Sequence, residues 1–271
     1  MAKEWWEGEL ANDILAVLRV KELTLAKFKA SSPQLAVRRY LVDWLAIIFE
    51  KVGSSYGILH LSVSLMDYFM DNHDIPEPQL HLVALTCFLL AAKFDETENR
   101  IPTIEQLNSF VHNSFERSEF HAMELILLDH FSWNVDLPTA ASFVEMFLVH
   151  SVLPDDNHSG RPLNNCAKAR VYVRKYVHYF LEISLQDHKF LSFKPSVVTA
   201  AAVASARSCL HLTPTWKPAL VELTHYEYFQ ICECVDLMLK AHDADEKAMS
   251  NSHAVVQSNS NVVLQSPAST N

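Results

Sequence analysis

The chain has 271 residues and a net charge of −10, and 49% of its residues are apolar. This length and apolar content allow two hydrophobic cores of ordinary size, while only four glycines argue against a turn-rich β architecture. No run of Lys or Arg exceeds two residues, so the sequence lacks the clustered basic surface that nucleic-acid binding requires.

The N-terminal segment predicts one amphipathic helix followed by a linker. Within residues 4–20, Leu10, Ile14, Val17 and Leu18 fall on one face of a helix. The linker ends at residues 31–33, where serine followed by proline is typical of a helix start. We therefore expect residues 1–32 to form an N-terminal helix and linker.

Five helices are expected between residues 33 and 134, at 34–53, 59–72, 80–96, 103–112 and 117–132. The third is the most apolar, because only His81 and Thr86 are polar between Leu80 and Ala92. A segment that is apolar on every side must be surrounded by other helices. It is too short to cross a bilayer, which needs about 20 apolar residues. The segment ends in Lys93, which we expect at the surface.

A second set of five helices follows the short extended bridge around Pro138. Their expected ranges are 139–151, 163–185, 195–211, 215–223 and 226–242, with a surface connection at 154–162. From residue 250 the chain is rich in Ser, Asn and Gln, a composition that cannot bury enough apolar surface to fold alone. The sequence thus predicts a second unit at 135–245 and a disordered tail at 246–271.

The two sets of helices form an internal repeat. In each set a proline is followed by an apolar, alanine-bearing helix that ends in a basic residue. A shift of 114 positions places Lys93 on Arg207 and Ala92 on Ala206. This layout predicts an all-α protein built from two five-helix units in tandem.

Four ordered motifs resemble those of the cyclin family. The string RRYLVDWL (38–45) is similar to the signature on the first helix of a cyclin box, and LLAAKFDE (89–96) to its lysine-bearing third helix. The strings AMELILLDHFSWNVDLPTAASF (122–143) and ISLQDHKFLSFKPSVVTAAAVASAR (183–207) resemble the following helix and the second box. The resemblance covers roughly residues 10 to 243 and implies two cyclin boxes, at 33–134 and 135–245.

The resemblance implies a regulatory subunit that binds and activates a cyclin-dependent serine/threonine kinase. In the family, residues at the positions of Lys93 and Glu124 hydrogen-bond the kinase helix that carries the catalytic glutamate. Phe94, Leu128 and Ile14 are expected to form the apolar surround that excludes water. The alternative for the pair alone is a surface ion pair within the chain, worth about 0–1 kcal/mol.

Three further matching positions are expected to be structural. Arg38 and Asp67 lie on consecutive predicted helices, where a bidentate pair fixes their register, and Leu82 belongs to the apolar helix. A possible substrate-docking patch comprises Val37, Tyr40, Leu41 and Trp44. Ile47 stands where the resemblance requires an acidic residue, so core packing is the favoured interpretation of this stripe.

No catalytic or metal-binding motif stands out. Glu222-x-x-His225 is half of a di-iron helix motif without a second copy, and Cys232 and Cys234 point apart on a predicted helix. The sequence has no phosphate loop or nucleophile elbow. We therefore expect no enzyme activity, no cofactor and no metal. The alternative function is a non-activating cyclin-box interaction or scaffold module, like the two-box cores of transcription factors.

The cellular location is predicted from the cysteines and the N-terminus. The five cysteines are odd in number and lie mostly in apolar helical stretches, which fits free thiols in a reducing compartment better than disulfides. The opening MAKEWWEGEL lacks the apolar core of a signal peptide. We expect an intracellular protein without a membrane partner, in the nucleus rather than the cytoplasm.

Overall fold

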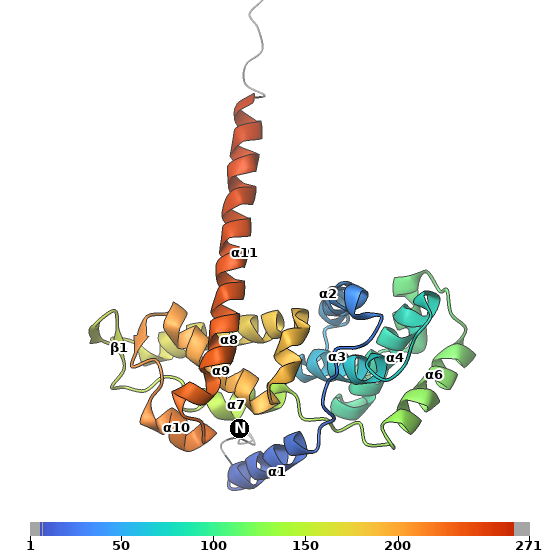
Figure 1. Ribbon diagram of the computed structural model, residues 1–271, viewed down its shortest axis with the longest axis horizontal. Helices are drawn as coiled ribbons and strands as arrows, with labels where there is room; N and C mark the ends of the chain where they lie inside the picture. The colour runs from blue at the N-terminus through green and yellow to red at the C-terminus, as the bar shows by residue number, and fades with distance from the viewer. Residues whose placement is uncertain (1–5, 7, 263–271) are drawn as a thin grey trace, which may run out of the picture.

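The computed structural model describes Trp6 and residues 8–262, with side chains as far as Ala248. Two helical units lie side by side, with α1 beneath them and α11 projecting from the second unit (Figure 1). The all-α class and the tandem arrangement predicted from the sequence are confirmed within these residues.

The first unit surrounds α4. Its helices are α2 (Leu35–Val52), α3 (Tyr56–Met70), α4 (Leu80–Asp95), α5 (Ile104–Asn108) and α6 (Arg117–His130). Every residue of α4 from Leu82 to Ala92 is buried, as a helix without a polar face requires. Gly53 ends α2 in the left-handed conformation with φ 73°, which glycine adopts without strain. Short 3₁₀ helices occur at η2 (Glu77–Gln79), η3 (Glu98–Arg100) and η4 (Ser109–Val111).

The second unit surrounds α9 in the same way. Its helices are α7 (Ala140–Leu148), α8 (Cys166–Gln186), α9 (Pro195–Cys209), α10 (Pro218–Thr224) and α11 (Tyr228–Val262), with η5 (His188–Ser192) before α9. Residues 196–207 of α9 are all buried, and small alanine side chains let α8 and α11 pack closely against it. The predicted surface connection contains two two-residue strands, β1 (Asn157–His158) and β2 (Arg161–Pro162). Together with β3 (Leu212–Thr213) they form an antiparallel sheet of order β2-β1-β3.

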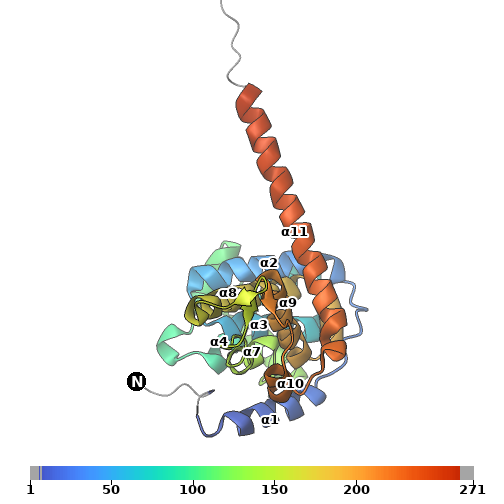
Figure 2. The same cartoon turned by 90° about the vertical axis from the view of Figure 1, so that its left-hand side faces the viewer.

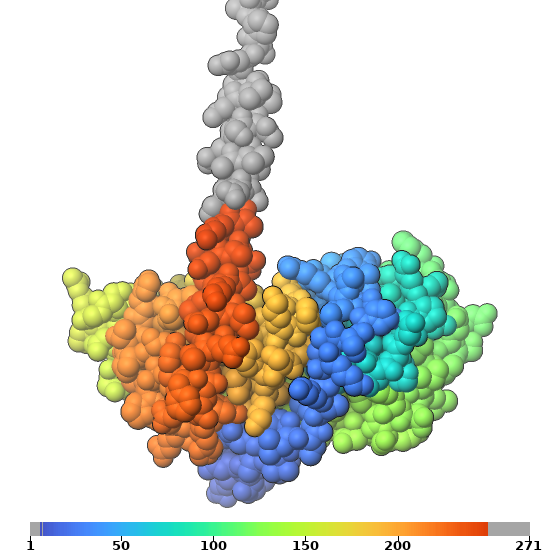
Figure 3. All heavy atoms as spheres, in the orientation of Figure 1, coloured from blue at the N-terminus to red at the C-terminus, as the bar shows by residue number. Residues whose placement is uncertain are grey.

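Helix α1 (Ala11–Leu23) begins and ends later than the range 4–20 predicted from the sequence. It packs mainly on α7 and α9 of the second unit. The helix continues past residue 20 because Glu22 is buried there and accepts hydrogen bonds from the backbone N and hydroxyl of Ser196, at 3.0 and 2.7 Å. Residues 24–33, none of which is buried, then run from α1 toward α2 (Figure 3).

Helix α11 extends far beyond the second unit, as Figure 2 shows. The sequence predicts a disordered tail from residue 246, and in the structure the backbone is helical as far as Val262. Once packing of the first turns has nucleated a helix, each added residue contributes one hydrogen bond, so a polar segment can continue it. The rest of the predicted tail, residues 263–271, lies outside the described residues.

Candidate functional site

Lys93 and Glu124 form an ion pair at the surface of the first unit. Lys93 lies in the last turn of α4, directly after the buried Ala92. Glu124 lies on α6 one turn after the buried Phe120, so the packing of α6 against α4 brings the two side chains together. The Lys93 side chain is 42% exposed and that of Glu124 is 13% exposed. A pair this exposed adds about 0–1 kcal/mol to stability, so it can open toward a partner at small cost.

Apolar side chains border this pair. Phe94 follows Lys93 and is 48% exposed, and Leu128 is half-buried one turn after Glu124. Leu125 is 58% exposed. Because successive helical residues turn by about 100°, Leu128 lies about 40° around α6 from Glu124, and Leu125 lies on the same side at about 100°. Leu125 was not among the residues expected from the sequence, because exposure of one apolar residue in a largely apolar helix cannot be read from its pattern.

Trp133 is a second exposed apolar residue that the sequence interpretation missed. It follows α6, its side chain is 68% exposed, and its backbone N–H donates to the Leu128 carbonyl at 2.8 Å. Both Ser132 and Trp133 have positive φ, at 50° and 63°. Residues other than glycine adopt this conformation at a free-energy cost, and such strain is concentrated at functional sites. A tryptophan just after a predicted helix is the sequence feature that could have pointed to this position. Its exposure and its positive φ, however, depend on the tertiary fold.

Ile14 does not fall within the surface around Lys93. It is half-buried on α1, which packs mainly on α7 and α9 rather than on α4 or α6. The structure therefore brings together Lys93, Glu124, Phe94 and Leu128 on two neighbouring helices and leaves Ile14 on a helix bound to the other unit. Sequence spacing could not determine which unit α1 would contact.

Arg38 and Asp67 form a buried bidentate pair between α2 and α3. The Arg38 Nε and Nη2 atoms lie 2.6 and 2.8 Å from the two carboxylate oxygens of Asp67. Burial raises the pKa of the Asp67 carboxyl, and the Arg38 guanidinium opposes that rise. Leu82, the third position expected to be structural, is buried on α4.

Arg38 also joins the two units, which the sequence did not indicate. Its Nη1 donates to the carbonyls of Leu185 and Gln186, at 2.9 and 3.3 Å. These carbonyls lie in the last turn of α8, where carbonyl oxygens have no N–H partner within the helix and carry partial negative charge. A cation at this position therefore holds the end of α8 against α2.

The stripe considered as a docking patch divides into buried and exposed residues. Leu41 is buried and Trp44 is half-buried, whereas Val37 and Tyr40 are exposed. The His81 ring lies edge-on to Trp44 at 4.7 Å between ring centroids, and its Nε2 lies 3.3 Å from the Tyr40 hydroxyl oxygen. Ile47, in place of an acidic residue, is also exposed.

The residue that the repeat places opposite Lys93 has a different environment. Arg207 ends α9 and is fully buried, with its Nη2 2.8 Å from Asp156 Oδ1. It also donates to the carbonyls of Ser151, Pro214 and Thr215. The repeat therefore has a surface cation in the first unit and a structural one in the second.

Among the described residues, no group of three or more His, Cys, Asp or Glu side chains is arranged to hold a metal ion. Cys234 is buried and Cys232 half-buried on α11, and all five cysteines are free thiols. None of the described helices is both long enough and apolar enough to span a membrane.

Comparison with protein-family models matches two domains in tandem. The model described as the N-terminal domain of cyclin matches residues 13–136, and that of the C-terminal domain matches residues 138–266. Together with the two five-helix units, these matches define a two-domain cyclin fold. The chain belongs to the cyclin family.

Within the family, the chain is similar in sequence to cyclin-J and cyclin-J-like proteins. Cyclin-J of Xenopus laevis is 45% identical over 251 residues, which are 91% of this chain and 65% of that protein. Cyclin-J of Homo sapiens is 44% identical and Cyclin-J-like protein of Mus musculus is 40% identical, each over 90% of this chain and 64% or 65% of the relative. The chain thus spans slightly less than two thirds of the length of these relatives.

Two solved structures share the fold. A viral cyclin from herpesvirus saimiri superposes with a TM-score of 0.64 at 16% identity, covering 84% of this chain and 97% of the viral protein. A chain of the CAK complex from Chaetomium thermophilum, bound to ATP-gamma-S, gives 0.56 at 17% identity, covering 84% of this chain and 71% of that chain. At these identities the likeness concerns the fold alone.

Proposed function

We propose that the chain is a cyclin-type regulatory subunit, not itself an enzyme, that binds and activates a cyclin-dependent serine/threonine kinase. We place its two cyclin boxes at 33–134 and 135–245 and its site of action inside the cell, in the nucleus rather than the cytoplasm. The observation that supports this function best is the exposed Lys93–Glu124 pair bordered by apolar side chains.

The chemistry of this surface suits a helix of another protein. The ends of a helix carry carbonyls and amides without backbone partners. The Lys93 ammonium donates to such carbonyls, and the Glu124 carboxylate accepts from such amides. Phe94, Leu125 and Leu128 supply apolar area that excludes water from these bonds, as the centre of a protein interface does. We add Leu125 and Trp133 to the proposed contact surface because both are exposed apolar residues, one on α6 and the other just after it.

Binding here activates a kinase by positioning its mobile helix. The helix that carries the catalytic glutamate moves inward, its glutamate pairs with the active-site lysine, and the activation loop becomes ordered. The chain contributes a rigid surface, because Lys93 directly follows the buried stretch Leu82–Ala92 of α4 and Glu124 lies on the helix packed against it. No group of the chain takes part in phosphoryl transfer.

Charge reversal at the pair tests the proposal. Lys93→Glu places two carboxylates side by side, and we expect it to abolish co-purification of a kinase while far-ultraviolet circular dichroism and the melting temperature stay unchanged. Arg174→Glu is a matched control, because Arg174 forms a comparably exposed pair with Glu145 in the second unit. Mass spectrometry of the co-purified proteins identifies the kinase, and a phosphorylation assay on that complex measures its activation.

The exchanged pair Lys93→Glu with Glu124→Lys separates partner binding from an internal ion pair. The double variant restores attraction within the chain but reverses the donors and acceptors that it presents to a partner. We expect kinase binding to remain lost. Binding that survives Lys93→Glu, or that returns in the double variant, would refute the proposed surface. A kinase that co-purifies without gaining activity would instead support the alternative, a non-activating scaffold module.

A further inference from the structure

A cavity of about 410 Å³ lies between the two units, beneath the linker that joins α1 to α2. Its walls come from the linker, α3, the start of α7, the end of α8, η5 and the start of α9. Four aromatic side chains line it: Phe28, Tyr68, Phe190 and Phe193. The volume lies within the range of about 300–1,000 Å³ that is typical of small-molecule sites, which often form between domains.

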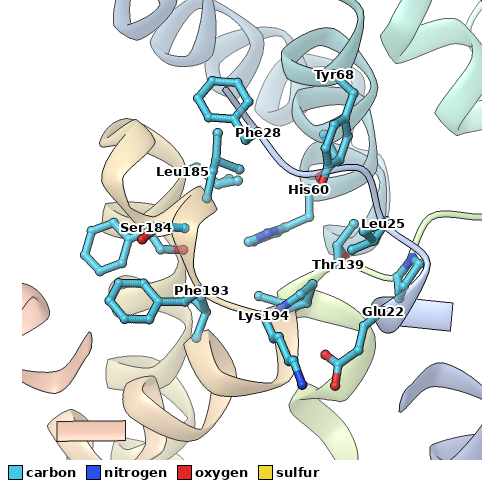
Figure 4. Close-up of a pocket in the computed structure, with 18 of the residues that line it drawn as sticks. Glu22, Leu25, Phe28, His60, Tyr68, Thr139, Ser184, Leu185, Phe193 and Lys194 are labelled. Atoms are coloured by element: carbon cyan, nitrogen blue, oxygen red, sulfur yellow. The ribbon is translucent and has the colours of Figure 1, made fainter. Parts of the chain in front are cut away.

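His60 is the polar group that distinguishes this cavity from a packing gap. Its ring projects from α3 toward the middle of the cavity (Figure 4). The residue is only 2% exposed, and its Nε2 atom has no hydrogen-bond partner. A buried polar atom without a partner is uncommon and unfavourable, so a bound molecule that supplies the missing bond gains affinity.

The imidazole is neutral and therefore calls for a neutral partner. Burial is the main cause that lowers the pKa of His60 to about 3, and the charge of nearby His178 contributes to the same shift. In a neutral imidazole Nε2 is either a donor or an acceptor, depending on the tautomer. A hydroxyl group both donates and accepts, so it can bond Nε2 in either state.

Charged groups around the cavity are already satisfied or reach water. Both carboxylate oxygens of Glu22 accept hydrogen bonds from Ser196. Lys27 and Lys194 line the cavity but are exposed residues. The remaining contacts for a bound molecule are the aromatic walls, which favour an apolar body.

We propose that this cavity binds a small neutral molecule with an aromatic or other apolar body and one hydroxyl group, which bonds Nε2 of His60. Such a molecule touches the linker and both units at once, so its binding stabilises their mutual contact. This site is separate from the surface around Lys93 and does not depend on the proposed kinase partner.

A matched pair of probes tests the site with the full chain alone. Thymol and para-cymene differ only by the phenolic hydroxyl group, and ligand-observed NMR titration measures their affinities. One hydrogen bond to a buried partner corresponds to about a five- to tenfold preference for thymol. His60→Leu should remove this preference, so that both probes bind within about twofold of each other. Ser64→Phe, which fills the cavity from α3, should prevent binding of both.

Several outcomes would overturn the proposal: no saturable binding of thymol, equal binding of both probes by the unchanged chain, or unaltered thymol binding by Ser64→Phe. Circular dichroism and thermal melting establish that each variant is folded. If a variant does not fold, nuclear Overhauser contacts between thymol and the rings of Phe28 and Phe193 in the unchanged chain decide. Their presence supports the site, and thymol binding without them refutes it.

Discussion

Replacing Arg207 by methionine should destabilise the second unit strongly. Arg207 and Asp156 are both completely buried, and the guanidinium donates to both carboxylate oxygens, at 2.8 and 3.0 Å. Methionine retains much of the side-chain volume but leaves Asp156 with Lys217, 2.8 Å away, as its remaining ion-pair partner. The carbonyls of Ser151, Pro214 and Thr215 lose their donor as well.

The expected loss of stability follows from the burial of the Arg207–Asp156 pair. Removing one partner of a buried ion pair costs about 3–5 kcal/mol, because a charge stays behind in a low-dielectric interior. Lys217 reduces the loss of stability because it still pairs with Asp156. Each carbonyl that loses its Arg207 donor and is not reached by water adds about 1–3 kcal/mol to the loss. We therefore expect the free energy of unfolding to fall by about 3–5 kcal/mol.

Urea unfolding followed by circular dichroism measures the change. Arg174→Met makes the same substitution at an exposed pair and should lose no more than about 1 kcal/mol. If Arg207→Met lost as little as this control, the reasoning from burial would be wrong.

The ion pair between Arg207 and Asp156 should also persist in mild acid. Burial raises the pKa of Asp156, but hydrogen bonds from Arg207 and Lys217 outweigh that effect and lower it to about 2. Its stabilising contribution is thus complete above the unfolded pKa of about 3.9 and is lost as pH falls toward 2.

Two further predictions concern the first unit. The pKa of His60 is lowered to about 3, so between about pH 6.5 and 3 only the unfolded chain binds its proton, and stability falls by about 1.4 kcal/mol per pH unit of acidification. His60→Leu should make the melting temperature fall less steeply on acidification between these limits, and a slope equal to that of the unchanged chain would contradict this. Arg38→Met should lose about 3–5 kcal/mol in urea unfolding because it strands the buried Asp67. Arg39→Met, at an exposed pair with Asp43, is its control and should be nearly neutral; equal losses would count against the role given to Arg38.

Much of the fold could be predicted from short-range patterns. The burial of α4 follows from its lack of a polar face, and the end of α2 follows from Gly53, which adopts the left-handed conformation that ends helices. The Arg38–Asp67 pair was expected from the family resemblance, which marks both positions, and the structure shows the pair between consecutive helices. The burial of α4 and the end of α2 need only neighbours in sequence.

The candidate surface was predicted only in part. Lys93 and Glu124 were identified through the family resemblance, and the structure places them in contact. Ile14 was assigned to the same surface, but α1 packs mainly on the second unit. The exposure of Leu125 and Trp133 was not predicted, because an apolar residue on a helix is expected to be buried unless the packing around it is known.

The sequence by itself determined most of the helices, though not the bounds of α1 and α11, and it determined the two-unit repeat. Hydrophobic periodicity and helix-ending residues act over a few neighbouring positions. Only the tertiary structure decided the contacts between distant residues. It placed Arg38 against the end of α8, buried Arg207 where the repeat has the exposed Lys93, and enclosed His60 in a cavity between the units. The physical reason is that burial and charge pairing depend on which distant segments pack together, and a local stretch of sequence does not specify its distant packing partners.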